Sequence, residues 1–273
     1  MRMINQKVNE IKNDEVYIIN ISIVGKKKNR YYVETSDDNY YFDEDTIVKY
    51  VILKGKTFKE KEFKDILKKA KVSEAFNKSI KYLSKSKKST FEVKEYLRKK
   101  NLYNDPFDDY TIEECIKLLK EYNYINDYDY AVSFLNTYKD NKGPNYIKEK
   151  LVNKRIHQDI INEVIKMFDN EEEKAMNIAL KIKNVEGFNK QPILKQKTKI
   201  YNKLISLGFD SSLSQLVLSR LEYEDDSSET LKKDFEKLKA KYGFNKDYET
   251  EQKIKASLIR KGYNYKDIEK LMK

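Results

Sequence analysis

The sequence predicts a mainly α-helical protein: an elongated array of tandem three-helix repeats preceded by a small N-terminal domain that contains β-strands. Composition is one reason, because 37% of the 273 residues are charged, Trp is absent, and Gly and Pro number only seven and three. This profile is typical of a long helical protein with a charged surface. A second reason is that β-forming residues gather near the N-terminus. The third is that leucines recur about every 54 residues in the remainder.

The first 70 residues differ from the rest in having β-strand patterns. Strands are predicted at residues 16–24, 30–35 and 40–42, with turns at 26–29 and 36–39 and a candidate additional strand at 3–11. Acidic residues 43–45 then precede a segment with helical apolar spacing, as carboxylates do in the first turn of a helix. The remainder of this domain, to residue 70, is predicted to be helical.

From residue 73 onward the apolar residues follow helical spacing throughout. Ser89 and Glu92 are spaced as a capping box, which predicts that a helix begins there. Three prolines are expected in the first turns of new helices: Pro106, Pro144 and Pro192. Further N-cap candidates are Asn126, Asp210 and Ser227.

Four leucines define an internal repeat: Leu97, Leu151, Leu204 and Leu258, spaced 54, 53 and 54 residues apart. The third residue after each leucine is Lys100, Lys154, Leu207 or Lys261, which is a cation in three of the four repeats. The next residue is Asn or Gly in three of four: Asn101, Arg155, Gly208 and Gly262. An apolar residue follows: Leu102, Ile156, Phe209 or Tyr263. This order is typical of a helix C-terminus with one left-handed residue, so each leucine is expected to be buried near the end of a middle helix.

The period predicts the domain organisation. One helix lies upstream and one downstream of each leucine-bearing helix, so each unit holds three helices that pack on neighbouring units. We expect an N-terminal domain over residues 1–70 and three-helix repeats over residues 71–126, 127–170, 171–226 and 227–273.

The sequence offers no set of residues for catalysis. His157 is the only histidine and stands at a predicted helix start, where an exposed or capping position is expected. Cys115, the only cysteine, is expected to be a core thiol in a reducing compartment. The acidic runs at 171–173 and 222–226 are expected to begin and end helices rather than to hold a metal. We therefore expect no enzyme activity, no metal and no cofactor.

Neither membrane insertion nor secretion is expected. The longest apolar stretch, residues 16–24, is far shorter than the roughly 20 residues that cross a bilayer. Residues 1–10 lack the continuous apolar core and the small-residue cleavage site of a secretory signal. The expected location is the cytoplasm.

The charge distribution predicts an anionic partner. The formal net charge is +11, although the AT-rich codons of Lys, Asn, Ile and Tyr account for part of the lysine excess. Nine basic and only two acidic side chains lie between residues 78 and 100. This density favours a polyanion such as the DNA backbone or an acidic protein lobe, with a solvated lysine-rich surface as the alternative. Tyrosines such as Tyr96, Tyr122 and Tyr130 are expected in packing rather than in base stacking.

Short motifs in a fixed order carry a resemblance to a known family. They are Tyr40-Tyr41-Phe42-Asp43-Glu44-Asp45, Leu53-Lys54-Gly55-Lys56, Tyr82-Leu83-Ser84 with Ser86-Lys87-Lys88-Ser89, Asn123-Tyr124-Ile125-Asn126-Asp127 with Tyr130-Ala131, and Lys142-Gly143-Pro144 with Leu151. In this order the chain resembles the RecX family, in its longer form with an N-terminal β-containing extension. Two departures stand out. Ser86-Lys87-Lys88 replaces an arginine-rich element and loses guanidinium geometry. Arg155 replaces a glycine, so the second middle helix is expected to end slightly early.

The resemblance implies a non-catalytic regulator that lies along the groove of the RecA nucleoprotein filament and restrains its recombinase and co-protease activities. It places the chain in DNA repair, DNA recombination and the SOS response. Expected partners are the RecA filament and the phosphate backbone of single-stranded or double-stranded DNA, with no membrane partner and a monomeric state. The residues expected to bind filament or DNA are Lys85, Lys87, Lys88, Arg98, Lys99, Lys100, Lys154, Arg155, Arg260 and Lys261. The alternatives are a general DNA-binding helical-repeat protein without RecA specificity and a protein-interaction scaffold.

Overall fold

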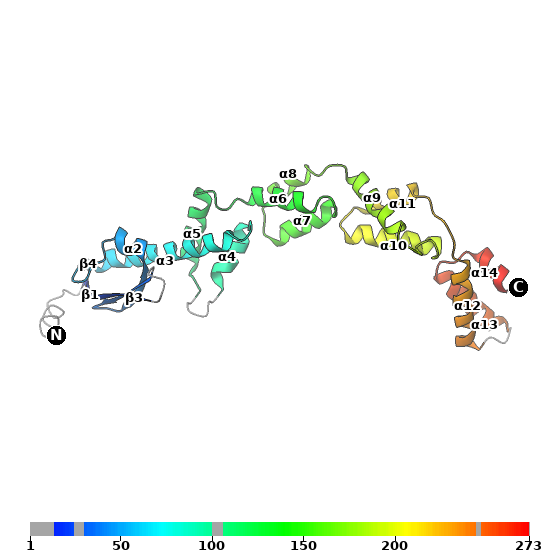
Figure 1. Cartoon of the computed structure of the whole chain (residues 1–273), viewed down its shortest axis with the longest axis horizontal. Coiled ribbons are helices and arrows are strands. Elements are labelled where there is room, and N and C mark those ends of the chain that lie inside the picture. The colour runs from blue at the N-terminus through cyan, green and yellow to red at the C-terminus, as the bar shows by residue number, and fades with distance from the viewer. Residues whose placement is uncertain (1–13, 25–29, 100–105, 244–246, 273) are drawn as a thin grey trace. The chain divides into compact units, whose positions relative to one another are not determined.

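The structure, a computed structural model, describes residues 14–24, 30–99, 106–243 and 247–272 (Figure 1). Within these ranges the chain forms 13 helices and one four-stranded sheet. The prediction of a mainly helical chain with a small N-terminal β-containing domain is confirmed. The chain folds as two compact units, Met1–Tyr130 and Ala131–Lys273.

The sheet is antiparallel with strand order β3-β2-β1-β4. Its strands are β1 (Glu15–Ile23), β2 (Arg30–Thr35), β3 (Asn39–Asp43) and β4 (Thr57–Lys59). The three predicted strands are confirmed, whereas residues 3–11 and 26–29 lie outside the described residues. The expectation of helix up to residue 70 is wrong at β4, because Phe58 inserts into the core and its strand pairs with the edge of β1.

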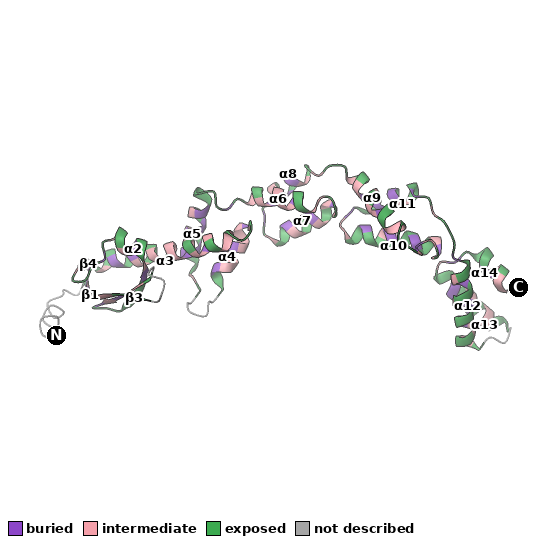
Figure 2. Ribbon diagram, viewed as in Figure 1, coloured by how far each residue is buried: buried purple, intermediate pink, exposed green. Residues whose placement is uncertain are grey.

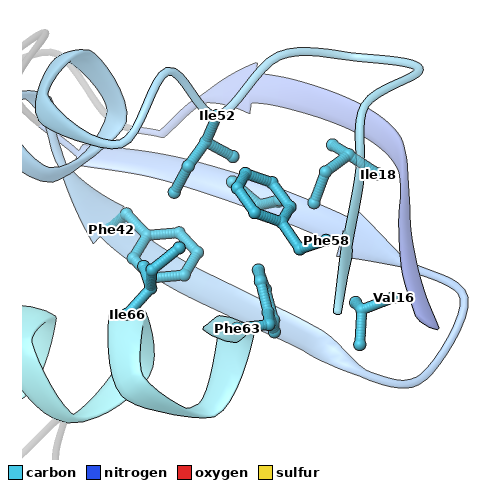
Figure 3. Close-up of a cluster of buried hydrophobic side chains, with 8 residues drawn as sticks. Val16, Ile18, Phe42, Ile52, Phe58, Phe63 and Ile66 are labelled. Carbon is cyan, nitrogen blue, oxygen red and sulfur yellow. The ribbon is translucent and has the colours of Figure 1, made fainter. Parts of the chain in front are cut away.

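One face of the sheet carries the first hydrophobic core (Figure 3). The sheet contributes Val16, Ile18, Val33, Phe42 and Phe58 to this core, and the segment before β4 contributes Ile52. Helix α2 (Glu44–Lys49) follows β3, and the Asp43 carboxylate caps it by accepting a bond from the Thr46 amide at 2.9 Å. Helix α3 (Glu60–Leu83) covers the core with Phe63 and Ile66.

Helix α3 is continuous and serves two cores. Its first turns pack on the sheet, whereas Ala75 and Ser79, both fully buried, lie in the first helical repeat. Alternating buried and exposed segments along the helices in Figure 2 reflect this amphipathic packing. The boundary expected between residues 70 and 71 therefore falls inside a single helix.

Four middle helices carry the repeated leucines. Leu97 lies in α4 (Thr90–Arg98), Leu151 in α7 (Pro144–Asn153), Leu204 in α10 (Ile193–Ser206) and Leu258 in α13 (Tyr248–Arg260). Each leucine stands one or two residues before the end of its helix and is at most 2% exposed, so their predicted equivalence is confirmed. The flanking helices are α5 (Asp109–Glu121), α6 (Asp127–Tyr138), α8 (Gln158–Ile165), α9 (Glu171–Lys183), α11 (Ser211–Arg220), α12 (Ser228–Tyr242) and α14 (Tyr265–Met272).

Three of the middle helices end in the predicted way. Arg155, Gly208 and Gly262 adopt left-handed backbone with φ of 56°, 89° and 94°. In each of these three helices, the amide of the residue that follows donates a hydrogen bond to the carbonyl of the repeat leucine. The donors are Ile156, Phe209 and Tyr263, at 3.2, 3.1 and 3.3 Å. This is the Schellman arrangement. The expectation that Arg155 shortens its helix is wrong, because α7 ends two residues after Leu151, as α10 and α13 do after their leucines. Asn101 and Leu102 lie outside the described residues.

The predicted caps are mostly confirmed. Ser89 and Glu92 form the capping box of α4, and Pro144 is the first residue of α7. Asn126 and Asp210 accept bonds from the first amides of α6 and α11, and Ser227 stands at the N-cap of α12. Pro192, expected in a first turn, stands one residue earlier, at the N-cap of α10. Pro106 is an incorrect prediction. It precedes α5, whose cap is Asp108, because the Asp108 carboxylate satisfies the Thr111 amide at 2.8 Å.

Backbone contacts between two glycines join the second repeat to the third. The Gly143 amide donates to the Leu207 carbonyl at 2.8 Å, and the Asn145 amide donates to the Gly208 carbonyl at 3.0 Å. A β-carbon on Gly143 would lie 2.4 Å from the Gly208 oxygen. Glycine is therefore required here by close approach of two backbones.

Candidate functional site

The cations of the first repeat occupy the two ends of α4. Lys85, Lys87 and Lys88 lie in the connection from α3 to α4, and Arg98 and Lys99 end the helix. At 1.5 Å per residue, this nine-residue helix separates the two groups by roughly 13 Å. Lys100 lies outside the described residues. The predicted arrangement at opposite ends of one middle helix is confirmed for the other five.

Several cations in this region are paired with acids from other helices. Arg98 bonds to Glu95 and to Asp109, both at 3.2 Å, and the bonds to Asp109 and Glu95 raise the pKa of its guanidinium. Lys94 pairs with Glu113 at 2.6 Å. These acidic partners lie on α5 as well as on α4, so counting charges along the sequence overstated the local positive charge.

Lys85, Lys87 and Lys99 remain available to a partner. All three are exposed, and within the described residues none of them forms an ion pair. Such cations lose little hydration when an anion binds, and their positive charge attracts polyanions at long range. These three cations are therefore suited to contact phosphate or carboxylate groups.

A stacked pair of tyrosines underlies Lys88. The Tyr82 and Tyr96 rings are parallel, with centroids 4.2 Å apart and an interplanar angle of 5°. The Lys88 ammonium lies 5.2 Å from the Tyr82 centroid, a cation–π contact that holds it beside the start of α4. The prediction that Tyr96 serves in packing is confirmed, whereas Tyr122 is 66% exposed and makes a T-shaped contact with Phe76, with the ring centroids 5.9 Å apart.

The remaining predicted residues lie at the ends of α7 and α13. Lys154 is half-buried and Arg155 is exposed beyond the end of α7. Lys261 pairs with Asp234 at 2.9 Å, and Arg260 bonds back to the Ala256 carbonyl at 3.4 Å. The structure thus places these residues at the ends of middle helices in separate repeats rather than in one cluster, and Lys154 and Lys261 occupy equivalent positions.

A cavity of about 470 Å³ adjoins Arg260 and Lys261. Lys195 and Thr198 of α10 line it as well, and sequence reasoning did not identify them. Their proximity arises because Gly262, one residue beyond Lys261, lies against Leu194, 3.2 Å from a would-be β-carbon. Only the three-dimensional stacking of neighbouring repeats reveals this proximity.

The groups considered for chemistry have structural roles. His157 is exposed and caps α8 through its Nδ1, which accepts from the Asp159 amide at 3.4 Å. Cys115 is fully buried, and burial raises the pKa of its thiol. The run at 171–173 forms the first turn of α9, and 222–226 connects α11 to α12. The capping position of His157, the core position of Cys115 and the helix start at 171–173 are confirmed, whereas 222–226 lies between two helices and does not begin or end one. Within the described ranges, acidic, His and Cys side chains form no group suited to a metal ion, and no helix is long and apolar enough to cross a bilayer.

Comparison with known proteins identifies close relatives. No protein-family model matches the chain. Regulatory protein RecX of Streptococcus agalactiae is 33% identical over 263 residues, covering 93% of this chain and 98% of the relative. Regulatory protein RecX of Listeria monocytogenes is 32% identical over 260 residues, covering 92% and 94%.

The fold agrees with these sequence similarities. A crystal structure of regulatory protein RecX matches 75% of this chain and all of its own chain, with a TM-score of 0.57 and 23% identity. The two sequence relatives bear the name of a regulatory protein, which confirms the prediction of a regulator without catalytic activity. On these similarities, the chain belongs to the RecX family of regulatory proteins.

Proposed function

We propose that this protein binds the RecA nucleoprotein filament in the cytoplasm and restrains RecA-promoted strand exchange and repressor self-cleavage. Its relatives carry the name regulatory protein RecX, and the resemblance to that family implies action on RecA without chemistry of its own. The same proposal includes contacts to the phosphate backbone of the DNA inside the filament, a monomeric regulator and no cofactor.

One observation supports the proposal most: exposed, unneutralised cations stand at both ends of α4. Lys87 lies before the helix and Lys99 directly after it, roughly 13 Å apart by the length of the helix. The positive end of the helix dipole adds to the first group. A phosphate track or an acidic groove of a protein would contact both groups at once, whereas a compact anion would reach only one.

A triple charge reversal tests this surface. Lys87→Glu, Lys88→Glu and Lys99→Glu together should leave helical content unchanged and stability within about 1 kcal/mol, because the sites are exposed or half-buried. Binding to RecA filaments should weaken and its dependence on salt concentration should flatten. Fluorescence anisotropy at two salt concentrations measures both effects.

The matched control carries the same change in charge on another helix. Lys232, Lys233 and Lys237 are exposed residues of α12, and their conversion to Glu should affect filament binding less than the first-repeat variant does. If the α12 variant loses more affinity than the first-repeat variant, the main contact lies in the fourth repeat instead, near Arg260 and Lys261.

A general DNA-binding protein is the second candidate, favoured by the net charge of +11. The two candidates differ in what they inhibit. A filament regulator should lower strand exchange and repressor self-cleavage at amounts well below those of RecA. A general DNA binder should instead act only when it is abundant enough to cover the DNA, and it should not affect self-cleavage once filaments are formed.

A further inference from the structure

A groove lies beside the glycine contact between the second and third repeats. Its lining comes from the α6–α7 connection, from α9, from the α9–α10 connection and from the end of α10. The residues are Asn141, Lys142, Ile178, Lys181, Ile182, Val185, Phe188, Lys199 and Leu207, and the volume is about 430 Å³. This volume falls within the roughly 300–1,000 Å³ typical of ligand-binding clefts.

The groove is preformed by rigid contacts. The carbonyl of one lining residue, Leu207, accepts the Gly143 amide at 2.8 Å, and Gly143 directly follows another lining residue, Lys142. Because the two glycine backbones touch, the walls are held at one spacing by main-chain bonds rather than by mobile side chains. A preformed groove orders fewer groups on binding and so favours association.

Apolar side chains form its floor. Among the apolar lining residues Phe188 is 2% exposed, Ile178 and Ile182 are half-buried, and Val185 is 60% exposed. Val185, Ile178 and Ile182 therefore present apolar surface to solvent. A partner that covers this surface would be stabilised by the hydrophobic effect. A DNA phosphate backbone supplies no apolar group for this floor.

Lysines form the rim. Lys142, Lys181 and Lys199 line the groove, and none of the described residues that line it is acidic. Lys142 lies over the Tyr146 ring at 4.6 Å and Lys199 over the Phe188 ring at 5.7 Å, and within the described residues no ion pair joins any of the three to an acid. The nearby Asp140 instead faces Lys174 at 3.9 Å. The rim is therefore complementary to carboxylates.

From an apolar floor inside a cationic rim, we propose that this groove binds an acidic peptide segment of a protein partner, anchored by a large apolar side chain. The anchor fills the floor between Ile178 and Val185, and flanking Asp or Glu side chains pair with the lysines. This acidic-peptide site goes beyond filament binding, since its argument uses no RecA contact and no residue of the first repeat.

The test uses the full chain and fluorescein-labelled probe peptides of about twelve residues, in which Asp and Glu flank one central Phe. Anisotropy should show saturable binding, and replacing the Phe by Ala should weaken it by at least about tenfold. Lys181→Glu with Lys199→Glu should weaken it similarly, whereas the charge-matched pair Lys232→Glu with Lys233→Glu should not. Both variants should unfold at the parent's urea midpoint.

Several outcomes would overturn the site. Equal affinity for the Phe and Ala peptides would mean general electrostatic attraction. If single-stranded DNA displaces the peptide when both carry the same concentration of negative charges, the groove is a nucleic-acid surface. Absence of peptide binding would reject the site even if filament binding is intact. Conversely, peptide binding without filament binding would retain the site and reject the proposed function, so the two proposals fail separately.

Discussion

Arg155 occupies a position that glycine fills in two of the other repeats, and a glycine there should be more stable than an alanine. Its φ of 56° lies in the left-handed region. That conformation costs an L-residue with a β-carbon about 1–2 kcal/mol. Glycine avoids this cost but loses about 0.5–1 kcal/mol more backbone entropy on folding. The net expectation for Arg155→Gly is a stabilisation of about 0.5–1 kcal/mol over Arg155→Ala.

The comparison between the Gly and Ala variants isolates the backbone effect, because both remove the contacts of the arginine side chain. Urea unfolding followed by far-ultraviolet circular dichroism gives the global stability. Repeat proteins can unfold in steps, so exchange of the Ile156 amide, which donates to Leu151, provides the local measure. A glycine variant no more stable than the alanine variant, with unchanged exchange, would refute the assignment of left-handed backbone to this residue.

Three further predictions concern the helical repeats. Leu204→Ala should destabilise the protein by roughly 2–5 kcal/mol in urea unfolding, since the side chain is fully buried, and a loss below about 1 kcal/mol would contradict its core position. Gly208→Ala should lower the melting temperature more than Gly243→Ala, because both have positive φ but only Gly208 meets a neighbouring backbone, at 2.3 Å; equal shifts would argue against the close approach. Burial raises the pKa of Asp234, but the bonds from Lys261 and Tyr263 and the charges of Lys261 and Lys237 together outweigh it and the net pKa is lowered, so stability should be lost as pH falls below about 4, and Asp234→Asn should flatten that loss. A pH profile identical in the parent and the variant would exclude this contribution.

The repeat architecture could be predicted from the sequence because helix ends have a local chemical signature. A left-handed residue and then an apolar residue follow Leu151, Leu204 and Leu258, with a cation before them in two of these three repeats, and their cause is the backbone itself. Even the exception at Arg155 keeps the same geometry, since hydrogen bonds to Leu151 hold the backbone there. Local rules also predicted the Ser89 capping box and the Asp210 cap.

The errors arose where distant residues decide the local structure. The strand at Thr57–Lys59 exists because β1 offers an edge and the core has room for Phe58. Pro106 lies outside α5 because Asp108, two residues later, is the better cap. Neither the open edge of β1 nor the preference for Asp108 as a cap produces a periodic pattern from which it could be predicted.

The candidate site was predicted only in part for the same reason. Sequence position placed the cations at the ends of α4, but Asp109 and Glu113 of α5 neutralise Arg98 and Lys94 from across the repeat. The groove near Gly143 is lined by segments from two repeats, so no single stretch of sequence predicts it. Charge counting along a chain cannot include acids supplied by a neighbouring helix.

Capture of the protein by RecA measures the central proposal most directly. The protein would be incubated with RecA alone, with single-stranded DNA alone, and with RecA filaments assembled on that DNA in a non-hydrolysable nucleotide, and bound protein would be quantified at two salt concentrations. Filament binding predicts strong capture by the assembled filament at both salt concentrations and little by either component. Capture by naked DNA equal to that by the filament, or no capture by the filament, would contradict it.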